Sequence, residues 1–313
     1  MLKAYSYIES EYLDPGIVDR SVFSIERKII AEFTANNPTP EVLSNCVFCG
    51  GFANVFISKE SVSYQRCSQC FSIFANVDDE IINRYKIYAP LMQFRNSPEF
   101  QNSAVKRRQD IWNDLLFWLE FRFARYLHGE PALKIINIGN RFNHLAEMIK
   151  NSSFCGSYND SEPADVVLYF DQFRCLANPI RALTEIRGLL RDSGLLVMNM
   201  TVGSGFDILA LRDKSENFLP YEVVLLPSTE GVEHLLNKAG FDVLEMSTPG
   251  ALDVQHVELS KDALGASDLF VQYLINKTDR STHAEFQRFL QKSGMSSHAR
   301  VIAKKRYGFD ETD

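Results

Sequence analysis

Four cysteines in the first third of the chain have the types and spacing of a metal site. They form two Cys-x-x-Cys pairs, Cys46 with Cys49 and Cys67 with Cys70, and 17 residues separate the pairs. A Cys-x-x-Cys turn places two thiolates on one side of a tight loop, and two such turns complete a tetrahedral shell with sulfur about 2.3 Å from zinc. Since all four ligands are cysteines, no position is left for water or a substrate. We therefore predict a closed, structural zinc site.

The alternative interpretation of these residues is a chance clustering of core cysteines. Four of the six cysteines fall in this one arrangement, whereas Cys155 and Cys175 are isolated and are interpreted as small core residues. No secretion signal opens the sequence, and no apolar run approaches the ~20 residues that span a bilayer. We expect a cytoplasmic protein without a membrane span, where reducing conditions favour metal ligands over disulfides.

The charge balance limits the partners. The 313-residue chain has a net charge of -7 and a pI near 5.5. A general nucleic-acid binder needs a basic face that replaces counterions, so we expect no nucleic-acid partner. Lys106, Arg107 and Arg108 form a short basic run, which we interpret as a solvated helix face and not as a binding patch.

Helices and strands are predicted around the cysteines. Apolar residues at helical spacing predict a helix over residues 21–34 and a longer one over 100–128. Residues 53–57 fit one strand of a small ribbon, and Phe71, Ile73 and Phe74 can begin another. We predict an N-terminal helical segment at 1–40, a zinc ribbon at 41–80 and a helical linker region at 81–131.

From residue 132 onward, strands alternate with helices. Strands are predicted at 133–138, 165–170, 195–200, 241–246 and 299–303, and helices at 142–150, 179–190, 229–239, 262–275 and 282–293. This alternation is typical of βαβ units and of a mostly parallel sheet covered on both faces. The predicted fold class is therefore α/β, with one domain over 132–313.

The stretch from Ile135 to Val254 resembles class I S-adenosylmethionine-dependent methyltransferases. The run KIINIG at 134–139 stands where that family has its first strand and glycine loop, and ADVVLYF at 164–170 resembles its "fDvV" strand. Residues 189–196 resemble "lLkpgG.l", and AGFDV at 239–243 resembles "aGF.v". The resemblance implies a Rossmann-like, doubly wound sheet whose last strand is antiparallel.

The resemblance also implies a cofactor site and a class of acceptor. S-adenosylmethionine would bind across the cofactor residues Gly139, Asn140, Asp160, Phe170 and Asp171. With its zinc ribbon, the chain is similar to bacterial methyltransferases that include sugar C-methyltransferases and enzymes of surface-polysaccharide pathways. Segments 248–253 and 296–300 also resemble that group. The acceptor would be a nucleotide sugar or a related small polar molecule.

The sequence departs from the family at this same site. The glycine loop keeps only Gly139, and too few residues lie between Asp160 and Asp165 for the family's next helix and third strand. Arg174-Cys175 stands where the family often has Glu-His, and a second family histidine is replaced within Tyr221–Val223. No catalytic residue is therefore assigned; by position alone, Asp171 and Glu222 are candidate bases.

Two functions follow from this conflict. The chain is either an active methyltransferase or a non-catalytic descendant that serves as a scaffold or regulatory partner, because a fold alone does not establish a function. In the second case a protein partner or a homo-oligomer is expected. A nicotinamide dehydrogenase is disfavoured because the GxGxxG pattern is absent.

Overall fold

A six-stranded sheet forms the centre of the computed structural model, which describes residues 20–37, 41–127, 132–139, 143–159 and 163–309. The strands lie in the order β5 (Cys155–Tyr158), β4 (Leu133–Ile138), β6 (Ala164–Phe170), β7 (Leu190–Thr201), β10 (His298–Lys305) and β9 (Phe241–Ser247). β4 pairs in parallel with both β5 and β6, and β10 is antiparallel to both β7 and β9. The predicted α/β fold with a buried first strand and an antiparallel last strand is confirmed.

The described sheet ends at β5, as predicted from the short connection between Asp160 and Asp165 in the sequence. β5 ends at Tyr158 and β6 begins at Ala164, so the two strands are joined by five residues. In the described part of the chain, no strand pairs with the outer side of β5. This agrees with the expectation that the family's third strand has no room here.

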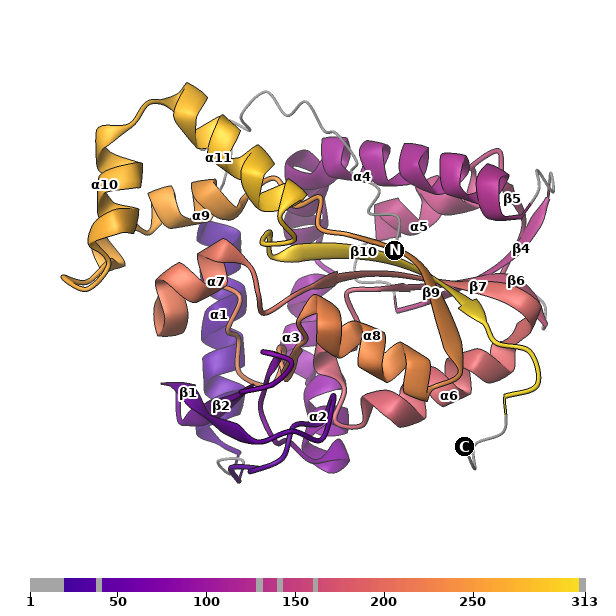
Figure 1. The fold of residues 1–313 in the computed structure, drawn as a ribbon, viewed down its shortest axis with the longest axis horizontal. Coiled ribbons are helices and arrows are strands. Elements are labelled where there is room, and N and C mark those ends of the chain that lie inside the picture. The colour runs from indigo at the N-terminus through magenta and orange to yellow at the C-terminus, as the bar shows by residue number, and fades with distance from the viewer. Residues whose placement is uncertain (1–19, 38–40, 128–131, 140–142, 160–162, 310–313) are drawn as a thin grey trace.

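Helices cover both faces of the sheet (Figure 1). α4 (Pro98–Tyr126) and α5 (Asn143–Lys150) pack on one face, where Trp118 and Leu119 meet Ile135 and Val197. α6 (Pro179–Leu189) and α8 (Thr229–Lys238) cover the other face. The apolar strand runs are therefore buried from both sides, as a parallel sheet requires.

The segment between α6 and the third predicted strand differs in detail from the expectation. β7 starts directly at Leu190, but its pairing with β6 jumps from Leu190 to Leu195. The residues between the predicted helix at 179–190 and the predicted strand at 195–200 thus form a bulge within β7, with Ser193 at φ 64°.

A second, smaller sheet adjoins the cysteine turns, and Cys67 is the last residue of its second strand. It has the order β1 (Ala53–Lys59), β2 (Val62–Cys67), β3 (Ile73–Phe74) and β8 (Leu225–Leu226). The strand β8 comes from the second half of the chain, and one apolar core runs from Phe74 through Leu226 to Leu235. The proposed division of the chain at 40, 80 and 131 stays a prediction.

Several helices gather at the carboxyl end of the large sheet, on the left of Figure 1. They are α1 (Arg20–Ala35), α7 (Phe206–Leu211), α9 (Asp253–Leu259), α10 (Leu269–Lys277) and α11 (Arg280–Lys292), while α2 (Asp79–Lys86) and α3 (Ala89–Arg95) precede α4. α7, α9, α10 and α11 share a third apolar core around Val257 and Leu290. Helix α9 was not expected, and α10 begins later than the predicted 262. Among the described residues, no helix combines the length and the apolar content that a membrane span needs.

Candidate functional site

The four cysteines converge as predicted. Their Sγ atoms all lie within 4.8 Å of one another, with 3.6 Å between Cys46 and Cys70 and 3.6 Å between Cys49 and Cys67. Four sulfurs placed about 2.3 Å from one metal would be about 3.8 Å apart in a tetrahedron. The cluster therefore has the size and the donor set of a zinc site.

The local backbone supports thiolates in this cluster. The amides of Phe48 and Gln69 point at the first cysteine of their own turns, at 3.4 Å from Cys46 Sγ and 3.3 Å from Cys67 Sγ. The contact between Cys46 and Cys70 raises the pKa of the Cys46 thiol and lowers that of Cys70 to about 4, so this pair shares one proton and holds one thiolate. Metals bind the deprotonated form of cysteine, so these contacts suit a metal ligand.

The second cysteine turn is tied to the large domain. Ser228, the N-cap of α8, donates through its Oγ to the carbonyl of Cys70 and through its amide to Ser72 Oγ at 2.9 Å. A β-carbon on Gly231 would overlap with Ser72 Oγ, so glycine permits this close approach. The cysteine cluster thus holds α8 as well as the ribbon.

The cofactor residues predicted from the resemblance are only partly described. Asn140 and Asp160 lie outside the described residues. Gly139 has φ +80°, and a β-carbon there would overlap with the side chain of Gln172, which lies against it. Phe170 is buried at the end of β6, and Asp171 has φ 58° and donates its amide to the carbonyl of Asn199 at 2.9 Å. The structure therefore brings Gly139 and the Phe170–Asp171 turn to one edge, with Gln172 between them.

Polar side chains end three apolar rows on the α4 face of the sheet. Because side chains alternate along a strand, Leu133 and Ile135 are followed by Asn137 on β4, and Leu195 and Val197 by Asn199 on β7. On antiparallel β10, Ile302 is followed toward the same edge by Arg300 and His298. The carboxyl edge of this face is therefore lined by amides, an imidazole and a guanidinium.

Three atoms of this polar edge have no hydrogen-bond partner among the described residues. They are Oδ1 of Asn137, Oδ1 of Asn199 and Nε2 of His298, and all three are buried. Burial lowers the pKa of His298 to about 4, so its imidazole is neutral at pH 7. Unpaired buried polar atoms are rare in folded proteins and call for a ligand or water.

Arg174 and Glu222, which come from the two segments where the resemblance implies a Glu-His pair and a second histidine, are bonded to each other. Glu222 is 3% exposed and accepts hydrogen bonds from Arg174 at 2.7 Å, Arg95 at 2.8 Å and Tyr85 at 2.6 Å. Arg95 also bonds Glu26 of α1 at 2.8 Å. Both oxygens of Glu222 are therefore engaged by cationic and phenolic donors, which suits a structural counter-ion better than a free base.

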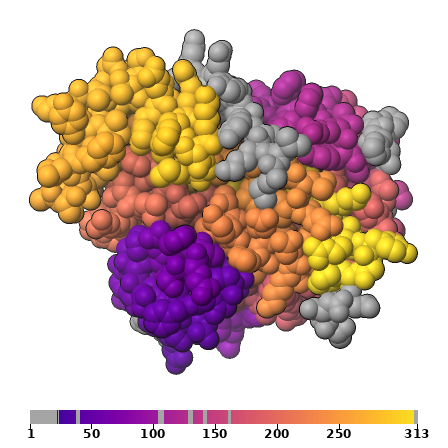
Figure 2. All heavy atoms as spheres, viewed as in Figure 1, coloured from indigo at the N-terminus to yellow at the C-terminus, as the bar shows by residue number. Residues whose placement is uncertain are grey.

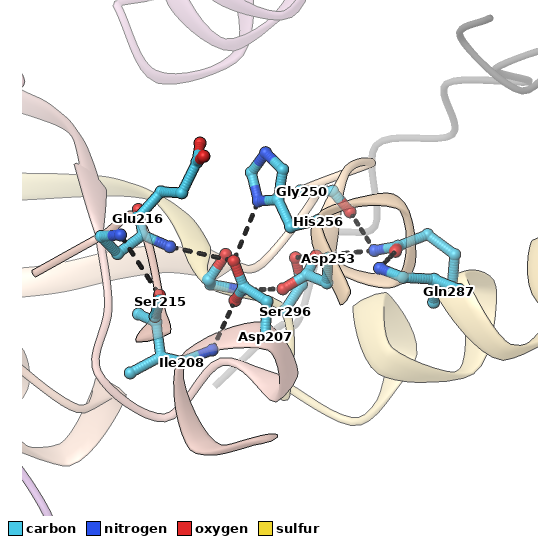
Figure 3. A network of polar contacts seen from close by, with 12 residues as sticks. Asp207, Ile208, Ser215, Glu216, Gly250, Asp253, His256, Gln287 and Ser296 are labelled. Atoms are coloured by element: carbon cyan, nitrogen blue, oxygen red, sulfur yellow. Dashed lines mark hydrogen bonds and ion pairs between the residues drawn. The ribbon is translucent and has the colours of Figure 1, made fainter. Parts of the chain in front are cut away.

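A second polar network lies among α7, α9 and α11 and was missed by the sequence reasoning. His256 Nδ1 is 3.0 Å from Oδ2 of Asp207, a fully buried carboxylate, and the other ring nitrogen points away from it (Figure 3). Burial would lower the pKa of His256, but the hydrogen bond and charge of Asp207 raise it overall, with help from Asp253 and Glu216. A carboxylate that fixes one nitrogen of an imidazole leaves the other able to exchange protons. Asp207 and His256 are 49 residues apart, and no short motif joins them.

Asp253 forms the other half of this network. Its two oxygens accept hydrogen bonds from Ser296 Oγ at 2.6 Å, Gln287 Nε2 at 2.7 Å and the amide of Ser297 at 2.6 Å (Figure 3). Burial, together with the charge of Asp207, raises the pKa of Asp253. These contacts connect the segments 248–253 and 296–300, which the resemblance had singled out separately.

Comparison with known proteins gives structural matches only. No family model matches the chain, and no curated protein matches its sequence. Among solved structures, the chain is similar to the cyclase SpnF, with 14% identity, 61% of this chain and 80% of that chain covered and a TM-score of 0.36. It is similar to the plantazolicin methyltransferase BamL, with 13% identity, coverage of 72% and 98% and a TM-score of 0.36. An S-adenosylmethionine-dependent methyltransferase from Mesorhizobium loti gives 11% identity, coverage of 61% and 98% and a TM-score of 0.34. Because these identities and TM-scores are low, we take the fold class from the strand order and pairing of the sheet itself.

Proposed function

We propose that the chain binds S-adenosylmethionine at the carboxyl edge of the six-stranded sheet and transfers its methyl group to a small polar acceptor. The resemblance suggests a nucleotide sugar as the acceptor and a structural zinc ion in the ribbon. The observation that supports this proposal best is the polar edge, where Asn137, Asn199 and His298 each keep a buried polar atom without a protein partner among the described residues.

The position of these atoms matches the place where doubly wound sheets bind ligands, outside the carboxyl ends of their strands. Leaving a buried polar atom unpaired costs about 1–3 kcal/mol. A ligand rich in amino and hydroxyl groups would donate to the two amide oxygens and bond the imidazole. The polar edge therefore fits the hydrogen-bonding groups of the proposed cofactor.

In this proposal the residues of the chain bind and align. Asn137 and Asn199 hold polar groups, Phe170 gives an apolar wall, and Gly139 lets the backbone approach closely. The bound cofactor would supply an electrophilic methyl group. Methyl transfer depends chiefly on alignment of the acceptor with that group. Since both oxygens of Glu222 are engaged, proton removal from the acceptor is not assigned to it.

A non-catalytic scaffold is the second candidate, and two observations favour it. The side chain of Gln172 lies against Gly139, where a cofactor would need to approach the backbone. Cys175 stands where the resemblance places the histidine of the Glu-His pair, and its Sγ donates to the carbonyl of Glu222 at 2.8 Å, while Arg174 bonds the Glu222 carboxylate at 2.7 Å. In this case the domain would serve a protein partner or a second copy of the chain.

Calorimetric titration with S-adenosylmethionine and S-adenosylhomocysteine separates the two. We expect weak binding, because the chain lacks most of the glycine loop and the third strand that the resemblance implies. If each of these two losses costs about 1–3 kcal/mol of binding free energy, a micromolar site moves toward the millimolar range. Gln172→Ala should tighten binding by opening the space beside Gly139, and Asn199→Leu should abolish it. Asn113→Leu, the same change at an exposed position on α4, is the control.

The cofactor site and the scaffold predict different titration results. Binding that tightens in Gln172→Ala, and is lost in Asn199→Leu but not in the control, supports the cofactor site. Heat changes absent from both the wild type and Gln172→Ala would leave the scaffold as the function of this fold.

A further inference from the structure

A separate cavity of about 470 Å³ lies where the ribbon meets the large domain. Its walls come from β2, the turn after Cys70, the loop after β7, the start of α8, the end of β9 and the end of α11. The ribbon, in indigo, lies directly against the orange segment that contains α8 (Figure 2). This volume is within the range of small-molecule sites, roughly 300–1,000 Å³. None of its lining residues belongs to the polar edge described above.

Three lining residues have a buried polar atom without a hydrogen-bond partner in the described part of the chain. They are Arg66 through Nε, Ser204 through Oγ and Ser247 through Oγ, and Ser247 as a whole is only 7% exposed. All three groups can donate a hydrogen bond. An acceptor-rich group, such as an oxyanion, would satisfy them.

Arg66 is the centre of this donor set. Its guanidinium lies 5.7 Å from the ring centre of Phe56 and 5.2 Å from that of Phe71, and it makes no ion pair within the described residues. Arg66 directly precedes Cys67 and pairs with Ile73 across the ribbon, so the cysteine cluster fixes its position. A planar guanidinium held in this way matches carboxylate and phosphate groups.

The lining carries both signs of charge. Lys292 at the end of α11 adds a second cation, whereas Glu230 and Glu233 on the first turns of α8 add two carboxylates. Phe71 and Met246 provide apolar surface between them. An anion alone would meet the repulsion of the α8 carboxylates, while an amino group on the same molecule would pair with them.

We propose that this cavity binds a small zwitterion, in which a carboxylate or a phosphate is separated by a few bonds from an amino group. The oxyanion contacts Arg66 and Ser247, and the amino group contacts Glu233. This site goes beyond the proposed methyltransferase function and does not depend on it, because the two sites share no residue.

The test is thermal-shift screening followed by calorimetry on the zinc-loaded full chain. The probes are the standard amino acids for the carboxylate source and phosphoethanolamine for the phosphate source. Acetate, inorganic phosphate and ethanolamine carry one kind of charge each and serve as reference ligands. We expect at least one zwitterion to stabilise the protein and the single-charge reference ligands to do so about tenfold less effectively, since each lost charged contact costs more than about 1.4 kcal/mol.

Variants connect the binding to the cavity. Arg66→Met keeps the stem over Phe71 but removes the charge, and Glu233→Gln removes the opposite charge; each should weaken zwitterion binding about tenfold or more. Arg181→Met, on the exposed face of α6, is the matched control. Zinc content and the S-adenosylmethionine titration should be unchanged in all three.

Three results would overturn the proposal. The first is the absence of binding by any amino acid or by phosphoethanolamine. The second is binding by acetate or phosphate alone as tightly as by a zwitterion, which would mark a simple anion site. The third is that Arg66→Met and Glu233→Gln both bind the zwitterion as tightly as the control variant Arg181→Met does.

Discussion

Replacing Glu222 by glutamine keeps the shape of the side chain and removes its charge. Glu222 is 3% exposed and is the common acceptor for Arg174, Arg95 and Tyr85. Arg95 keeps Glu26 as a second partner, but no other carboxylate is shown bonded to Arg174 in the described structure. The amide would also direct its own N–H groups at cationic donors.

The expected cost is large because the cluster is buried. Removing one partner of a buried ion pair costs about 3–5 kcal/mol, since the remaining charge stays desolvated. Urea unfolding followed by circular dichroism at 25 °C should show this loss in the unfolding free energy of Glu222→Gln. Glu185→Gln is the control, because the Arg181–Glu185 pair has the same chemistry at 3.0 Å but is 71% and 65% exposed. Its cost should stay below about 0.5 kcal/mol.

The same variant separates a structural role from catalysis. A loss below about 1 kcal/mol in Glu222→Gln, similar to the control, would refute the assignment of Glu222 as a buried counter-ion. A double-mutant cycle with Arg174→Met should give a coupling energy above about 1 kcal/mol, because the two side chains share a contact. A methyl-transfer rate that falls while stability is unchanged would instead identify Glu222 as the base.

Three further predictions concern the metal, the glycine turn and the histidine. Protein purified without added metal should contain close to one zinc per chain by elemental analysis, and Cys67→Ser should lose it and unfold the ribbon; chains free of metal would contradict the site. Gly139→Ala should destabilise the domain by more than about 1 kcal/mol, because φ is +80° and the new methyl group meets Gln172; Gly188→Ala, with open space around it, is the control for the urea midpoint. The raised pKa of His256 means that its stabilising contribution is complete below its unfolded pKa of about 6.5 and is lost as pH rises through the folded value. His256→Gln should therefore cost more at pH 6 than at pH 9, and an equal cost at both would contradict the contact with Asp207.

The sequence predicts best what is local. Each Cys-x-x-Cys pair is fixed by one short loop, and the runs at 133–138 and 164–170 are strands because apolar, largely β-branched or aromatic residues dominate them. The antiparallel last strand follows from the resemblance. Helix α9 is not predicted from the sequence because it has only seven residues, too few to show a clear helical period.

Contacts between distant segments could not be predicted. The strands β3 and β8 have two residues each, and they pair across about 150 positions of the chain. Both Arg174 and Glu222 were singled out by the sequence, yet only the fold shows that they bond each other. The overlap of Gln172 with the space above Gly139 depends on a rotamer and on Asp171 in a left-handed conformation, and neither has a sequence pattern.

The buried cluster around Glu222 gives a physical reason to assign this carboxylate a structural role. A general base needs a free proton acceptor, whereas Glu222 binds Arg174 and Arg95, and Arg95 also binds Glu26 of α1. The cluster therefore fastens the N-terminal helices to the loops beside the sheet. The polar edge, by contrast, keeps unpaired groups at Asn137 and Asn199. A structural Glu222 is compatible with the proposed ligand site, because binding a ligand at the carboxyl edge needs hydrogen-bonding groups but no proton acceptor.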